Sequence, residues 1–61
     1  MRKEARALTR TDILFKDCET KECVEKTKDM LHAEFSINQL DKEIIEYMFS
    51  KAEEKLKQLG E

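Results

Sequence analysis

The apolar residues in the C-terminal part of the chain recur at helical spacing, and this pattern restricts the fold more than any other feature. One helical face carries residues three or four positions apart: Ile37, Leu40, Ile44, Met48, Ala52, Leu56 and Leu59. Ile45 and Phe49 widen this stripe. A stripe this wide suits a helix that packs against two neighbours rather than a narrow coiled-coil seam. The pattern therefore predicts a long helix over residues 38–59.

Capping signals flank this predicted helix at both ends. Ser36 and Gln39 have the spacing of a capping box, and Asn38 or Asp41 are alternative caps. Gly60, the only glycine, stands where a left-handed C-terminal cap is needed.

Two shorter helices are predicted upstream, over residues 4–17 and 20–35. The first has a face made of Ala7, Leu8, Thr11, Leu14, Phe15 and Cys18. The second has a face made of Cys23, Val24, Thr27, Met30, Leu31 and Phe35. Thr20 is a suitable N-cap for the second helix. Ile13 lies off the first stripe, so either it contacts a partner or the first helix begins only at Thr11.

The chain is therefore expected to be a single all-α domain over residues 1–61. We expect a small three-helix bundle, a helical hairpin plus an N-terminal helix, packed antiparallel or as an intertwined dimer. A chain of 61 residues buries only about 60% of its unfolded surface and is marginal alone. A protein partner or self-association is therefore predicted.

Charge is distributed unevenly along the chain. The first ten residues carry four basic side chains and Glu4, a net charge of +3, and the remainder carries eight lysines against thirteen acidic residues, a net charge of −5. A basic end on an acidic body argues against nucleic-acid binding by the whole domain. It predicts contact between the N-terminal segment and an acidic partner surface. The alternative is that these charges serve only solubility, since surface charge often has no partner.

Some of the apolar surface of the long helix is also expected to remain free for a partner, a second copy of the chain or an acyl chain, because three short helices cannot hide all of it. The predicted partner-binding residues are Arg2, Lys3, Arg6, Arg10, Ile45 and Phe49. We therefore expect a non-catalytic adaptor or accessory subunit. A small homodimeric regulator that touches nucleic acid through the basic N-terminus is an alternative.

The two cysteines are the first candidates for chemistry. Cys18 and Cys23 are five residues apart, so on one helix they would point about 140° apart. We interpret them as buried reduced thiols, although a turn between them would permit a bridge. A zinc site with His32 would have only three ligands and no recognisable spacing.

No catalytic constellation emerges from the remaining residues. His32 has no positioned nucleophile, and the carboxylate pairs of the long helix fall on its charged face. We predict no enzyme activity, no cofactor and no metal. The chain has no apolar run of membrane-spanning length and no secretory hydrophobic region. An intracellular protein, cytoplasmic or mitochondrial and not secreted, is therefore expected.

The run AEFSINQLDKEIIEYMFSKAEEKLKQLG resembles the second half of the LYR-motif (complex I LYR-like) family. The residues that carry the resemblance are Phe35, Asn38, Asp41, Glu43, Ile44 and Leu56. Upstream, Ala7-Leu8-Thr9-Arg10 resembles the Leu-Tyr-Arg signature, with Thr9 in place of the tyrosine. The resemblance implies a three-helix mitochondrial assembly factor that docks acyl carrier protein, with Arg6 and Arg10 facing that acidic partner.

Overall fold

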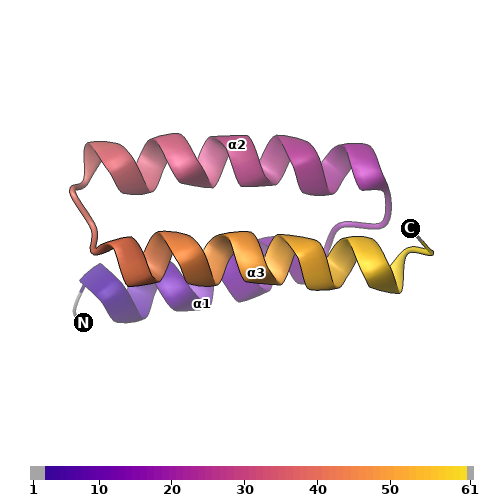
Figure 1. Cartoon of the computed structure of the whole chain (residues 1–61), viewed down its shortest axis with the longest axis horizontal. Coiled ribbons are helices and arrows are strands. Elements are labelled where there is room, and N and C mark those ends of the chain that lie inside the picture. The colour runs from indigo at the N-terminus through magenta and orange to yellow at the C-terminus, as the bar shows by residue number, and fades with distance from the viewer. Residues whose placement is uncertain (1–2, 61) are drawn as a thin grey trace.

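The computed structural model describes residues 3–60 and contains three helices, α1 (Lys3–Lys16), α2 (Lys21–Ile37) and α3 (Lys42–Gln58). This confirms the predicted all-α three-helix bundle. Figure 1 shows that each helix runs antiparallel to the preceding one, so α1 and α3 point the same way. Helix α3 packs against both other helices, whereas α1 and α2 make far fewer contacts with each other. The arrangement therefore has one open seam, between α1 and α2.

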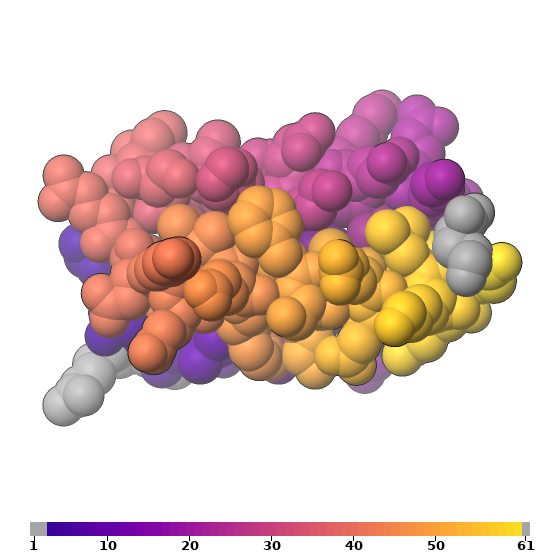
Figure 2. Space-filling view, in the orientation of Figure 1, coloured from indigo at the N-terminus to yellow at the C-terminus, as the bar shows by residue number. Residues whose placement is uncertain are grey.

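The apolar stripes of the three helices meet in one core. Its buried side chains are Ala7, Phe15, Cys18, Val24, Leu31, Phe35, Ile44, Met48 and Ala52. Phe35, Leu31 and Met48 are the largest of the fully buried side chains. In the space-filling view, side chains of α2 and α3 meet along the length of the two helices (Figure 2). The apolar residues that recur at helical spacing in the sequence therefore form the core of the bundle.

Thr11 is the one fully buried polar side chain among residues 3–60. Its hydroxyl donates a hydrogen bond to the Ala7 carbonyl oxygen, at 2.8 Å. A buried hydroxyl without a partner would destabilise the fold, and this bond back to the preceding turn removes that penalty. A threonine is thereby accommodated in the α1 stripe.

The turn between α1 and α2 corrects our interpretation of the cysteines. Cys18 lies in the turn, Cys23 lies in the first turn of α2, and the two form a disulfide with their Cα atoms 5.5 Å apart. Free buried thiols were therefore the wrong interpretation. Thr20 is the N-cap of α2, as predicted, and its side-chain oxygen accepts a hydrogen bond from the Cys23 amide at 3.1 Å. The chain thus turns between the two cysteines, which is the arrangement that permits a bridge.

The connection between α2 and α3 is longer than predicted, and the third helix begins at Lys42 rather than at residue 38. Ser36 still belongs to α2, and Gln39 adopts a left-handed conformation with a φ of 56°. The predicted capping box therefore does not form, and Asp41 is the N-cap of α3. At the far end of α3, Gly60 has a φ of 91°, the conformation that was predicted for it.

Candidate functional site

The open seam between α1 and α2 contains a surface groove. It has a volume of about 520 Å³ and lies between α1 and the C-terminal end of α2. Its apolar lining comes from Ala7, Ile13, Leu14, Phe35 and Leu40, and its polar lining from Lys3, Arg6, Thr9, Arg10, Glu34 and Asn38. An apolar floor with a few charged groups at the rim is the usual composition of a binding site.

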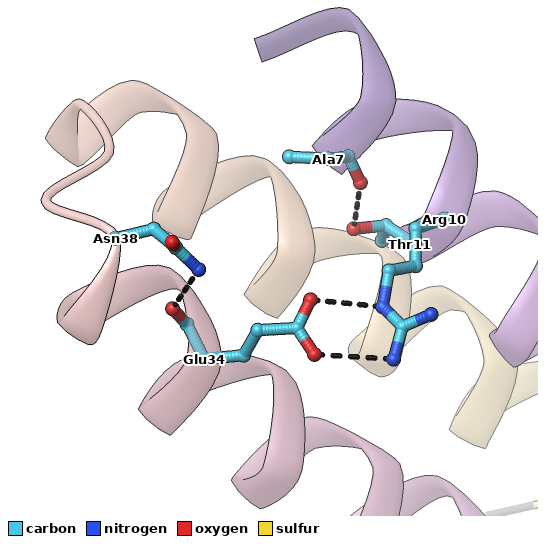
Figure 3. Close-up of polar contacts among 5 residues, drawn as sticks. All are labelled: Ala7, Arg10, Thr11, Glu34 and Asn38. Carbon is cyan, nitrogen blue, oxygen red and sulfur yellow. Dashed lines mark hydrogen bonds and ion pairs between the residues drawn. The ribbon is translucent and has the colours of Figure 1, made fainter. Parts of the chain in front are cut away.

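An ion pair crosses this groove from one helix to the other. The Arg10 guanidinium of α1 contacts the Glu34 carboxylate of α2 at two points, Nε to Oε2 at 2.8 Å and Nη2 to Oε1 at 3.1 Å (Figure 3). Both side chains are partly exposed, at 48% and 34%. The two-point geometry fixes the relative positions of α1 and α2 at the middle of the groove. Solvent reaches the pair, so its carboxylate and guanidinium remain accessible to a competing charge.

The backbone beneath Glu34 is also held in place. The Asn38 side-chain amide donates a hydrogen bond to the Glu34 carbonyl oxygen at 2.8 Å (Figure 3). Asn38 is the C-cap of α2, and its own backbone amide bonds the same carbonyl. These bonds satisfy carbonyl groups at the helix end and give Glu34 a rigid support.

The basic residues predicted from the sequence gather at the α1 edge of the groove. Lys3, Arg6 and Arg10 follow one another at steps of three and four residues, so they lie on one side of α1. Neither Lys3 nor Arg6 makes an ion pair with a described residue, and both are exposed. Arg2, the fourth predicted basic contact, lies outside the described residues. The groove therefore has an edge of positive charge in which Glu34 pairs with Arg10 and no described residue pairs with Lys3 or Arg6.

Exposed apolar residues lie on α1 and α2. The large apolar side chains that are exposed among residues 3–60 are Ile13 (55%), Met30 (45%) and Ile37 (79%). Ile13 lies three residues after Arg10 and lines the groove. Met30 lies four residues before Glu34 and Ile37 three residues after it, so both share the side of α2 that carries Glu34, although neither lines the groove. None of these three exposed side chains lies on α3.

Ile45 and Phe49, the predicted apolar contacts, occupy a different seam. Both are half-buried and pack against the core. Phe49 also contacts the His32 ring of α2, with ring centroids 5.2 Å apart. They therefore lie between α2 and α3, and the structure does not bring them together with the basic residues of α1. Their role in partner binding stays a prediction.

Sequence reasoning missed Glu34 as part of the site. In the sequence, nothing distinguishes Glu34 from the other charged residues of its helix, because its partner Arg10 is 24 residues away. Ile37 was assigned to the stripe of the third helix, but it is the last residue of α2. The sequence signals that pointed here were the basic residues of the N-terminal segment and Ile13, which lies off the stripe of α1.

The described residues offer little for chemistry. Nowhere in residues 3–60 do three or more His, Cys, Asp or Glu side chains come together as potential metal ligands. The pKa of Tyr47 is raised because its hydroxyl donates a hydrogen bond to the Asp12 carboxylate at 2.8 Å, and secondarily because of desolvation. This bond joins α3 to α1 on the surface, outside the groove. A raised tyrosine pKa of this origin is structural rather than catalytic.

Comparison with family models, curated proteins and solved structures finds no match for this chain. The fold defines the class of protein as a small three-helix bundle. Its groove has an apolar lining with charged residues at the rim. No helix of the described residues combines the length and the apolar character needed to cross a bilayer.

Proposed function

We propose that this chain is a non-catalytic adaptor or accessory subunit that binds a protein partner through the α1–α2 groove. The observation that carries the proposal is an apolar groove of about 520 Å³ that is lined by the exposed Ile13. Met30 and Ile37 are also exposed, on the side of α2 that carries Glu34. Clustered exposed apolar residues with a charged rim mark interaction surfaces more often than scattered ones.

The size of the chain supports the same proposal. A three-helix bundle of 61 residues has a small core, and association is a common additional source of stability for such chains. A partner that fills the groove would remove Ile13 from water. Complete burial of one large aliphatic or thioether side chain stabilises by roughly 1.5–3 kcal/mol.

A photo-crosslinking experiment tests this function. A photoreactive amino acid replaces Ile13 in cells that make the protein, and a matched variant carries it at Glu53, an exposed position on α3. We expect a discrete protein adduct from position 13 that is absent from position 53. An adduct with twice the mass of the chain would identify the partner as a second copy. Equal labelling from both positions, or none from position 13, would contradict the proposal.

The LYR-like function is a narrower second candidate. It is supported by the placement of Arg6, Thr9 and Arg10 along one groove, because these residues include the counterpart of the family signature. Under this candidate the protein is a mitochondrial assembly factor that co-purifies with acyl carrier protein. Charge reversal at Arg6 and Arg10 is expected to abolish co-purification, and retention of acyl carrier protein by that variant would remove the candidate.

A homodimeric regulator that touches nucleic acid is less well supported. Three basic side chains at one edge are few for phosphate binding, and the rest of the chain is acidic. This candidate predicts that the protein retards DNA or RNA in a gel and that salt weakens this binding. No retardation at low salt would exclude the candidate.

The cellular compartment of the protein is also a proposal. The sequence favoured a cytoplasmic or mitochondrial protein with reduced thiols. The Cys18–Cys23 disulfide favours an oxidising environment instead, because disulfides rarely persist in the reducing cytoplasm.

A further inference from the structure

The α1–α2 groove has the shape and the charge to select one kind of partner. We infer that its occupant is an amphipathic α-helix with a row of acidic residues along one edge, lying along α1 with its carboxylates facing Lys3, Arg6 and Arg10. This inference rests on the function proposed above and specifies the partner for the same site.

The first argument is the form of the groove. It runs between two antiparallel helices and is lined along α1 from Lys3 to Leu14. The 14 residues of α1 extend about 21 Å at 1.5 Å per residue. An elongated apolar groove between two helices accommodates a third helix, which places apolar residues into it at steps of three, four and seven. Ile13 and Leu14 of α1 and Phe35 of α2 provide the apolar lining of such a channel.

The second argument is charge complementarity. Lys3 and Arg6 have no ion-pair partner among residues 3–60, and Glu34 is the one acidic residue that lines the groove. The lining therefore carries three positive charges and one negative charge. A basic partner edge would be repelled, whereas an acidic edge would neutralise the excess and would also be steered toward the groove.

The third argument concerns Glu34. Its carboxylate contacts Arg10 at two points, which is the geometry that an acidic side chain of a partner would adopt. Glu34 thus occupies the position of a partner carboxylate and competes for Arg10. Removing its charge by Glu34→Gln frees Arg10, so this substitution is expected to strengthen binding of an acidic helix severalfold, whereas most interface substitutions weaken binding.

A displayed peptide library tests the inference without a known partner. The probe is a library of helix-forming peptides long enough to cover α1, with their surface positions randomised, selected on the full chain with its disulfide intact. We expect the selected peptides to carry apolar residues at steps of three and four and Asp or Glu along one edge. Arg6→Glu is expected to weaken their binding at least tenfold, and Lys57→Glu, the same charge change on the outward face of α3, to leave it unchanged.

The outcomes separate the inference from the function on which it rests. The selected peptides could lose binding to Ile13→Asp, have no acidic edge and bind Arg6→Glu as well as the unmodified chain. This result would overturn the inference about the acidic helix but not the proposed function. Peptides that bind Ile13→Asp as well as the unmodified chain, or a library that yields no binder, would overturn both. Circular dichroism of each variant shows whether the fold is retained, and Glu34→Gln gives an independent readout because it is expected to raise affinity.

Discussion

Arg10 and Glu34 are 24 residues apart in the sequence, and they join α1 to α2 through two charged hydrogen bonds across an otherwise open groove. The other two pairs of helices are held mainly by the apolar core, and α1 and α2 contact each other least. The pair therefore acts in two ways, because it aligns the two helices and it occupies part of the surface that a partner would need.

The first prediction concerns the energy of this pair. Because both side chains are partly exposed, the coupling between them should be about 0.5–1 kcal/mol, near the upper end for surface ion pairs. A double-mutant cycle with Arg10→Ala, Glu34→Ala and the double variant, measured by urea unfolding, gives this value. High salt should reduce it. Strictly additive single substitutions would contradict a role for the pair in alignment of the helices.

The second prediction concerns the bond between Tyr47 and Asp12. Tyr47 is the only tyrosine and the chain has no tryptophan, so the near-ultraviolet absorbance of the phenolate reports this residue alone. The midpoint of the Tyr47 titration should lie above the ordinary tyrosine pKa of 10.0, because the hydrogen bond to Asp12 favours the neutral hydroxyl. Asp12→Asn should bring the midpoint back toward 10.0.

The same shift has a consequence for stability at high pH. The folded pKa of Tyr47 is raised, so its stabilising contribution is fully present below pH 10.0 and is lost as pH rises through the folded pKa. The unmodified protein should therefore lose more stability in this alkaline range than Tyr47→Phe, which has no hydroxyl to ionise. Parallel pH profiles for the two proteins would contradict the assignment.

The third prediction concerns the disulfide. The Cys18–Cys23 bridge closes a short loop, and chain entropy gives a loop of this size a stabilisation of about 2 kcal/mol. Reduction should lower the free energy of unfolding by that amount, measured by urea unfolding with intact mass as the readout of oxidation state. A Cys18→Ala, Cys23→Ala variant is the control, and its unfolding curve should not respond to reductant. Coincident curves for oxidised and reduced protein would show that the bridge does not constrain the turn.

The fourth prediction compares a buried residue at the floor of the groove with an exposed residue at its edge. Phe35 is 1% exposed and Ile13 is 55% exposed. Phe35→Ala should cost about 3–5 kcal/mol, which is most of the stability of a small domain. Ile13→Ala should cost much less, roughly 0.5 kcal/mol or less for a surface site, and should affect partner binding instead. Thermal unfolding by circular dichroism separates the two, and comparable losses would mean that Ile13 belongs to the core.

Much of the fold could be predicted from the sequence because helical periodicity is a local signal. The apolar steps around Leu31, Phe35 and Met48 indicated three helices and their buried faces, and Thr20 marked the start of α2. The end of α2 could not be predicted. Ser36 and Gln39 had the spacing of a capping box, but α2 continues to Ile37 and Gln39 turns the chain in a left-handed conformation. Tertiary packing decides between such competing local signals.

The candidate site was predicted only in part. Lys3, Arg6 and Arg10 were identified because charge clustering is visible in a sequence. Their neighbours across the groove were not, since contacts between residues far apart in the sequence leave no local pattern. The cysteine bridge was missed for a related reason, because the turn between α1 and α2 contains neither Gly nor Pro and its position was weakly marked.

The most direct test of the central claim is an amide chemical-shift map of the isotope-labelled full chain, recorded with and without a peptide from the library selection. We expect the largest changes at Arg6, Ile13 and Glu34, on the two sides of the α1–α2 groove. Changes concentrated at Ile45 and Phe49, on the α2–α3 seam, would contradict the assignment of the groove as the binding site.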